Sequence, residues 1–314
     1  MTQLKVLVSG LSEPYRDELC QSAPPDIELR FAADSAALAA EIESADVVAG
    51  TVPAELLARA PRLRWVHSWA AGPDRALYPE MVDSPVLLTC SKGNGAIPLA
   101  EHAMMLMLLL NRSAMRWIRA QEAHRWEPFT HGELAGLTCA ILGLGFSGQD
   151  LALKAKAFHM RTIGVRRIPQ PTPNVDRVYP VEELHAFLGE ADFLVVTAPR
   201  TPQTRGMLGA AEFSAMRSTA YYVCFSRGGL ADDAALELAL RERWIAGAGL
   251  DAHGEEPLPE ESPFWDLPNV IVTPHNGATT VETRRRGVQI FIDNLRRFTR
   301  GEPLRNVVDK QLGY

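Results

Sequence analysis

Short apolar runs alternate along the chain with stretches of helical spacing. Each run is apolar at successive positions rather than at alternate ones, which is typical of strands buried on both faces of a parallel sheet. Strands that alternate with helices predict βα units. In the first series the expected strands are 4–8, 27–31, 46–50 and 63–67, and the expected helices are 13–22, 35–43 and a short one after Pro53.

A second series of the same kind follows a long apolar helix, which is expected over 96–118. A final helix is expected over about 279–300, because Gly301 and Pro303 cannot continue it. The Pro-rich segment 169–176 is interpreted as a surface loop. The strands expected in this series are 137–143, 161–165, 192–198, 220–225, 246–251 and 269–273.

The two series predict two doubly wound, parallel-sheet α/β domains. A chain of 314 residues is long enough for about two domains. The segment after the second series is too short to fold alone, so we expect it to return to the first domain. The prediction is a Rossmann nucleotide domain, 96–282, inserted into a smaller flavodoxin-like substrate domain formed by 1–95 and 283–314.

Charge and composition exclude several classes of protein. The net charge is −6 and the basic residues are scattered, so no nucleic-acid partner is expected. The longest apolar run, 103–110, has eight residues, whereas a membrane span needs about 20. The four cysteines are far apart without a CxxC motif, which favours a reducing cytoplasm and predicts no metal site.

A glycine-rich loop opens the second series. Residues 143–148, GLGFSG, match the pattern GxGxxG between an apolar strand and a helix, the context that a dinucleotide requires. Gly143 permits the tight turn, Gly145 admits the pyrophosphate, and Gly148 allows close helix packing. Phe146 and Ser147 complete the loop, and GFSG is not the GxSxG of a hydrolase.

Two arginines indicate which dinucleotide binds. An acidic residue that holds the ribose 2′-hydroxyl is expected about 20 residues into the motif. Arg166 stands 23 residues after Gly143, and Arg167 follows it. Because guanidinium groups bind a 2′-phosphate through charged, forked hydrogen bonds, we expect NADP(H) to be preferred, with NAD(H) possible. The alternative is that both arginines are solvated loop residues.

Three polar side chains each follow a predicted strand of the second series. They are Arg227 in CFSRGGL, Glu256 in HGEEPLP and His275 in TPHNGA. Ligands of a doubly wound sheet bind beyond the carboxyl ends of its strands. We therefore expect all three on the cofactor side of the sheet.

The chain resembles the D-isomer-specific 2-hydroxyacid dehydrogenase family, and most closely its glyoxylate/hydroxypyruvate reductase-like members. The resemblance covers nearly the whole chain, and its motifs occur in the family's order. The matching segments are AEHAMMLMLLLNR, GLGFSG, TAPRTPQTRGML, SRGGLADDAALELAL, GLDAHGEEPLP, NVIVTPHNGATT and NLRRFTRGEPLRNVVD. The resemblance implies a two-domain enzyme that forms a homodimer.

The resemblance also implies roles for individual residues. His275 would donate a proton to the carbonyl oxygen of a 2-keto acid, Glu256 would orient His275, and Arg227 would bind the substrate carboxylate. Ala71 and Gly72 match the loop whose backbone N–H groups hold that carboxylate. Further cofactor contacts are implied for Ala198, Pro199, Cys224, Phe225, Ser226, Asp251 and Asn276.

These roles predict a reversible, NADPH-dependent reduction of glyoxylate, hydroxypyruvate or pyruvate to the D-2-hydroxy acid. Two other functions remain open, a dinucleotide-sensing protein of the co-repressor type and a phosphite-type dehydrogenase. The chain departs from the family at three positions. Cys224 stands where Asn is usual, His253 where an aromatic or aliphatic residue is usual, and Arg200 where Leu is usual.

Several side chains have simpler interpretations. Met104, Met105 and Met107 are expected to pack in the core. His102 is expected to make a buried hydrogen bond. Trp69 and Trp126 are interpreted either as walls of the substrate pocket or as core residues.

Overall fold

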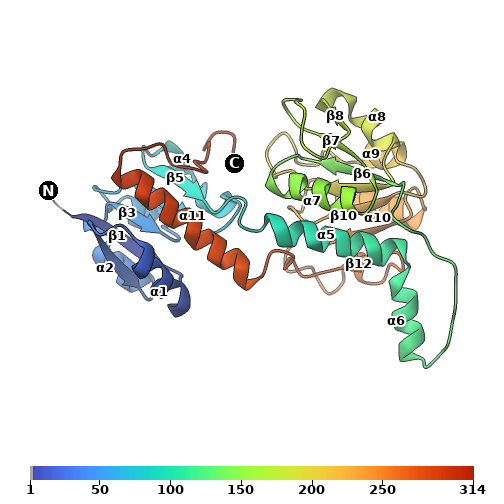
Figure 1. The fold of residues 1–314 in the computed structure, drawn as a ribbon, viewed down its shortest axis with the longest axis horizontal. Coiled ribbons are helices and arrows are strands. Elements are labelled where there is room, and N and C mark those ends of the chain that lie inside the picture. Colours follow the sequence, from blue (N-terminus) through green and yellow to red (C-terminus); the bar gives the residue numbers. More distant parts are fainter. Residues whose placement is uncertain (1–2) are drawn as a thin grey trace. The chain divides into compact units, whose positions relative to one another are not determined.

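A computed structural model describes residues 3–314, which fold into two compact units (Figure 1). One unit contains the chain up to Gly95 together with Thr280–Tyr314, and the other is Ala96–Thr279. Each unit is built on its own parallel sheet. The chain returns to the first unit between residues 279 and 280. The sequence predicted this boundary three residues later, between 282 and 283.

The first unit contains a five-stranded sheet in the order β2-β1-β3-β4-β5, with all neighbours parallel. This is the doubly wound order of flavodoxin-like domains. The strands are β1 Leu4–Ser9, β2 Ile27–Ala32, β3 Val47–Ala49, β4 Trp65–Ser68 and β5 Leu87–Cys90. The helices are α1 Glu13–Ser22, α2 Ser35–Glu41, α3 Ala54–Leu57, α4 Pro79–Asp83 and α11 Val281–Thr299.

The helix α11 explains why the chain returns to this unit. It lies across the sheet (Figure 1), and its Phe291 packs against Trp65 of β4 with ring centroids 5.4 Å apart. Phe291, Ile292 and Leu295 are buried together with residues of β1 and β3. The apolar face of α11 therefore completes the core of the first unit.

The second unit contains a seven-stranded parallel sheet in the order β12-β11-β10-β9-β6-β7-β8. The order reverses between β6 and β9, and such a switch point leaves a crevice for a ligand at the carboxyl ends of the strands. The strands are β6 Thr138–Leu142, β7 Arg161–Val165, β8 Arg177–Tyr179, β9 Phe193–Val196, β10 Tyr221–Cys224, β11 Gly247–Leu250 and β12 Val270–Val272. The predicted Rossmann topology is confirmed.

The expected single helix over 96–118 is wrong. Two helices, α5 Ala96–Asn111 and α6 Ala114–Glu122, meet at Ser113, which has a φ of +51°. A left-handed residue cannot continue an α-helix, so α6 leaves the axis of α5 and extends away from the rest of the unit (Figure 1). The other helices are α7 Phe146–Ala157, α8 Leu184–Gly189, α9 Ala210–Ala215 and α10 Asp233–Arg241.

The sheet of the second unit is covered by helices on both faces, which bury two apolar layers. Met104 and Met107 lie in one of these layers, as predicted, but Met105 is 40% exposed. Across residues 3–314, no helix is both long and apolar enough to cross a membrane. The same residues contain no group of three or more His, Cys, Asp or Glu side chains arranged to hold a metal ion.

Candidate active site

The glycine loop lies at the switch point of the seven-stranded sheet. Gly143 has a φ of +106°, and a Cβ there would lie 2.7 Å from the backbone nitrogen of Ala198. A Cβ at Gly148 would lie 2.2 Å from the Gly143 carbonyl oxygen. Both positions therefore require glycine, the first for backbone conformation and contact, and the second for contact alone.

The space beside the Cα atom of Gly145 is open. A Cβ there would meet no atom within 4 Å, and Gly145 caps the N-terminus of the 12-residue helix α7. Unpaired N–H groups in the first turn of a helix attract a phosphate. The loop thus has the room and the donors that a pyrophosphate needs.

A second observation fits a dinucleotide. Ser226 follows β10 at the carboxyl edge of the sheet, and its hydroxyl oxygen is buried without a hydrogen-bond partner within the described chain. A buried polar atom without a partner is uncommon in a folded protein. The residues present therefore fit a nicotinamide dinucleotide, which would lie along the ends of β6, β9 and β10.

The remaining predicted cofactor residues occupy neighbouring loops with different exposure. Ala198 is buried and Pro199 is exposed after β9, while Phe225 is buried after β10. Cys224 is buried at the end of β10, and burial raises the pKa of its thiol. Phe146 at the start of α7 is 54% exposed, Ser147 is half-buried, and Asn276 is exposed.

Arg166 and Arg167 follow the end of β7, the strand next to β6. Arg166 is half-buried, with Nη1 3.5 Å from the Thr172 hydroxyl oxygen. Arg167 is exposed. Charge and position therefore suit a phosphate beside the first two strands of the sheet.

Glu256 and His275 form a hydrogen-bonded pair. His275 Nδ1 lies 2.8 Å from each carboxylate oxygen of Glu256. Because a carboxylate only accepts, Nδ1 carries the proton and leaves Nε2 for a substrate. Burial raises the pKa of Glu256, but the hydrogen bonds from the His253 N–H and from His275 outweigh burial and hold that pKa below its usual value.

Asp251, which is fully buried, anchors the His275 loop through hydrogen bonds. Its carboxylate accepts hydrogen bonds from the Thr273 hydroxyl at 2.7 Å and from the backbone N–H groups of Asn276 and Gly277 at 3.1 and 3.0 Å. The sequence suggested Asp251 only as a cofactor contact and missed this anchoring. The missed role depends on residues more than 20 positions away, so local spacing could not reveal it.

His102 of α5 joins the same network. Its Nε2 lies 3.0 Å from the Thr273 hydroxyl oxygen and 3.5 Å from an Asp251 oxygen. The side chain is 12% exposed. The predicted hydrogen bond of His102 is present, although the side chain is not fully buried.

Arg227 lies on the loop after β10, half-buried, with Nη1 donating to the Ser226 carbonyl at 2.7 Å. The next residue, Gly228, packs against the His253 backbone of the Glu256 loop, where a Cβ would lie 1.7 Å from the His253 carbonyl oxygen. The structure thus brings the loops of Arg227 and Glu256 into contact. Loops at the ends of β10, β11 and β12 supply the three predicted catalytic residues.

Ala71 and Gly72, the predicted carboxylate-binding residues, lie in the first unit on the loop after β4. The Ala71 carbonyl accepts a hydrogen bond from the Cys90 thiol at 3.3 Å. Trp69 donates to the Ser9 carbonyl and packs against Phe291, which agrees with the core interpretation.

Trp126 is 97% exposed. Within one chain it therefore neither packs in a core nor lines a pocket, so both interpretations made from the sequence are wrong for this residue.

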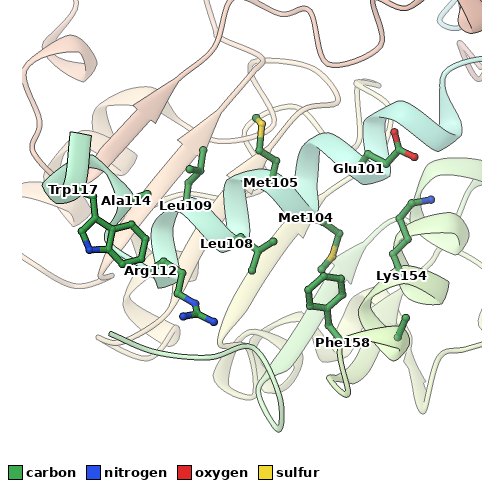
Figure 2. Close-up of a pocket in the computed structure, with 11 residues that line it drawn as sticks. Glu101, Met104, Met105, Leu108, Leu109, Arg112, Ala114, Trp117, Lys154 and Phe158 are labelled. Atoms are coloured by element: carbon green, nitrogen blue, oxygen red, sulfur yellow. The ribbon is translucent and has the colours of Figure 1, made fainter. Parts of the chain in front are cut away.

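A separate apolar pocket lies on the second unit, between α5, α6 and α7 (Figure 2). Its volume is about 630 Å³, and it contains none of the predicted site residues. Met105, Trp117 and Phe158 on its wall are each about 40% exposed. The lining residues are Glu101, Met104, Met105, Leu108, Leu109, Arg112, Ala114, Trp117, Lys154, Ala157 and Phe158.

The fold and the site define an oxidoreductase that uses a nicotinamide dinucleotide. Residues 104–277, more than half of the chain, match the family model described as D-isomer specific 2-hydroxyacid dehydrogenase, NAD binding domain. The chain belongs to this family and is an NAD(P)-dependent D-2-hydroxyacid dehydrogenase.

Individual relatives agree with this assignment. The chain is 34% identical over 267 residues to a glyoxylate reductase of Pyrococcus furiosus, a match that covers 82% of this chain and 79% of the relative. It is similar to the crystal structure of an NADPH-dependent glyoxylate/hydroxypyruvate reductase from Sinorhizobium meliloti in complex with NADP and sulfate. That match has a TM-score of 0.87 and 32% identity, and covers 99% of this chain and 100% of the other.

A family member from Xanthobacter autotrophicus, in complex with NADPH and MES, matches with a TM-score of 0.88 and 29% identity over 100% of both chains.

Proposed function

We propose that the enzyme reduces a small, unphosphorylated 2-keto acid, of the glyoxylate, hydroxypyruvate or pyruvate type, to the D-2-hydroxy acid with NADPH. The observation that carries this proposal is the Glu256–His275 pair at the carboxyl edge of the dinucleotide-binding sheet. The names of the glyoxylate reductase relatives support the substrate class.

The side chains at this edge supply the acid–base chemistry of the reaction. His275 donates the proton on Nε2 to the carbonyl oxygen as the carbonyl carbon is reduced, because Nδ1 is occupied by Glu256. Glu256 fixes the ring and stabilises the imidazolium that donates the proton. Arg227 binds the substrate carboxylate and polarises the carbonyl oxygen. The bound nicotinamide supplies the hydride.

In the reverse direction His275 takes the hydroxyl proton as a base. We propose that Ala71 and Gly72 contribute backbone N–H groups to the substrate carboxylate, and that Arg166 and Arg167 bind the 2′-phosphate of NADP(H). The complexes of two structural relatives with NADP and with NADPH support this cofactor preference.

A panel of 2-keto acids tests the proposed function. Purified enzyme is mixed with NADPH or NADH and each of glyoxylate, hydroxypyruvate, pyruvate and 3-phosphohydroxypyruvate, and the nicotinamide absorbance is followed. We expect reduction of an unphosphorylated acid, faster with NADPH. Glycolate, the product of glyoxylate, is achiral, so the D configuration is checked by chiral analysis of the products of hydroxypyruvate and pyruvate. Activity restricted to the phosphorylated acid, or to oxidation of phosphite by NADP or NAD, would overturn the proposal. Dinucleotide binding without turnover of any substrate would instead favour the sensing function.

We also propose that two copies of the chain associate through the apolar pocket of Figure 2 and the projecting α6. Trp126 lies on the segment after α6 and is 97% exposed. Pocket and projection belong to the same unit. In the proposed dimer the Trp126 segment of one copy covers the pocket of the other, and a twofold axis makes this contact reciprocal. Such a self-complementary surface is what a twofold dimer requires.

Light scattering after gel filtration tests this association. We expect a dimer for the unaltered chain, and a shift toward monomer for Trp126→Ser and for Met105→Asp. The control is Leu238→Ser on α10, an exposed apolar residue outside the pocket, 45% exposed. A monomeric chain, or a dimer unaffected by both substitutions, would contradict the proposed surface.

A further inference from the structure

His253 lies where the three catalytic loops meet. Only 8% of the residue is exposed. Its backbone N–H donates to Glu256 Oε1 at 3.0 Å, and its ring Nε2 lies 2.9 Å from the Thr273 carbonyl oxygen. Its own carbonyl packs against Gly228, next to Arg227. A single residue therefore contacts the loops that follow β10, β11 and β12.

The acceptor fixes the tautomer of the ring. A carbonyl oxygen has no proton to give, so Nε2–H of His253 is the donor to Thr273. A phenyl or aliphatic side chain at this position would fill the space without donating a hydrogen bond.

The hydrogen bond acts close to His275. Thr273 stands two residues before His275, whose φ is +50°. A left-handed conformation in a non-glycine residue is costly and persists only when its surroundings hold it. Asp251 holds the residues after His275, and His253 holds the carbonyl before it. Hydrogen bonds thus hold the backbone both before and after His275, and this fixes the position of its imidazole.

We propose that His253 is a positioning residue, which ties the Glu256 loop to the His275 loop through its Nε2–H and so keeps the two side chains aligned. This inference rests on the proposed function, in which the pair delivers the carbonyl proton. His253 need not touch the substrate for this role.

Two substitutions separate the hydrogen bond from packing. His253→Phe keeps an aromatic ring and removes the donor, whereas His253→Gln retains an amide N–H near the position of Nε2. Misplacement of a reacting group by about 1 Å can cost about 100-fold in rate. We expect His253→Phe to lower kcat by about 10- to 100-fold with little change in the Kd for NADPH. We expect His253→Gln to recover most of the rate.

The solvent isotope effect on kcat identifies the affected step. A misplaced proton donor makes proton transfer more limiting, so the ratio of rates in H₂O and D₂O should rise in His253→Phe and fall back in His253→Gln. His185→Phe is the matched control, because His185 is an exposed histidine of the same unit that pairs with Glu212 on α9 at 3.0 Å. It should leave both quantities unchanged.

Two results would overturn the positioning role. An unchanged kcat and isotope effect in His253→Phe would show that the hydrogen bond is dispensable. Equal impairment of His253→Phe and His253→Gln would assign the loss to packing. If His253→Phe does not fold, as judged by its thermal transition, His253→Met provides the donor-free variant.

A spectroscopic measurement keeps this inference separate from the proposed function. In protein labelled with ¹⁵N-histidine, the Nδ1–H of His275 should give a proton resonance protected from exchange by Glu256. His253→Phe should broaden or remove it, and His253→Gln should retain it. If the enzyme reduces no 2-keto acid, the proposed function fails, while this resonance still tests the alignment. An identical resonance in all three proteins would contradict the positioning role.

Discussion

In the proposed mechanism, the shape of the Arg227 side chain matters as much as its charge. A guanidinium can hold a carboxylate through two parallel hydrogen bonds, and a lysine ammonium cannot. We therefore expect Arg227→Lys to lower kcat/KM for the keto acid strongly while leaving the Kd for NADPH nearly unchanged. Steady-state kinetics and a fluorescence titration with NADPH measure the two quantities. An equal loss of cofactor affinity would make Arg227 a cofactor or structural residue.

Arg166 determines cofactor choice in this account. A hydrogen bond to a charged group contributes about 1.5–3 kcal/mol, which corresponds to roughly a ten- to hundredfold preference for NADPH. Arg166→Asp should remove this attraction, add repulsion, and move the preference toward NADH. The ratio of kcat/KM values for NADPH and NADH measures the change. An unaltered enzyme that prefers NADH would show that the two arginines are solvated loop residues.

His67 in β4 makes the stability of the first unit depend on pH. The ring is fully buried, and burial lowers its pKa to about 3. The unfolded chain regains the ordinary pKa of about 6.5 and binds the extra proton. Above about pH 6.5, His67 therefore does not lower the free energy of unfolding. Below that pH, the free energy of unfolding should fall by about 1.4 kcal/mol per pH unit as the pH drops toward 3.

Urea unfolding at several acidic pH values measures this loss. His67→Gln cannot titrate and should show a shallower fall than the unaltered chain. Parallel curves for the two proteins would mean that other groups cause the acid sensitivity.

At the scale of elements, the glycine loop separates folding from cofactor binding. A Cβ at Gly148 would press on the Gly143 backbone, whereas one at Gly145 would enter open space. Gly148→Ala should lower both the Tm and the affinity for NADPH. Gly145→Ala should keep the Tm and lose affinity, because its methyl group occupies the space proposed for the pyrophosphate. Calorimetry and NADPH titration distinguish the two, and unchanged affinity in Gly145→Ala would place the cofactor elsewhere.

Elements with a strong local pattern could be predicted from the sequence, and those shaped by distant contacts could not. The strands around Gly143 were predictable because apolar runs and glycines mark them. The three-residue strand β8, Arg177–Tyr179, follows a Pro-rich segment and is defined mainly by pairing with β7. The break at Ser113 lies in a segment of continuous helical pattern, so neither composition nor spacing marks its left-handed conformation.

At the scale of the whole molecule, the sequence placed Arg227, Glu256 and His275 at strand ends, and parallel topology brings such ends to one edge. The contacts that align the pair were not predictable. Asp251 and His253 act across loops through backbone groups of residues 273, 276 and 277. Sequence spacing indicates which residues carry the chemistry, whereas the tertiary fold determines which residues hold them.

The proton donor is the centre of this account, and His275→Ala tests it most directly. The substitution removes the imidazole beside Glu256, and loss of a general acid lowers kcat by about 10²–10⁴-fold. The measurement is kcat for the preferred 2-keto acid, with the Kd for NADPH determined on the same preparations. The account predicts a loss of kcat in this range with cofactor binding preserved. Near-normal turnover in His275→Ala would contradict it.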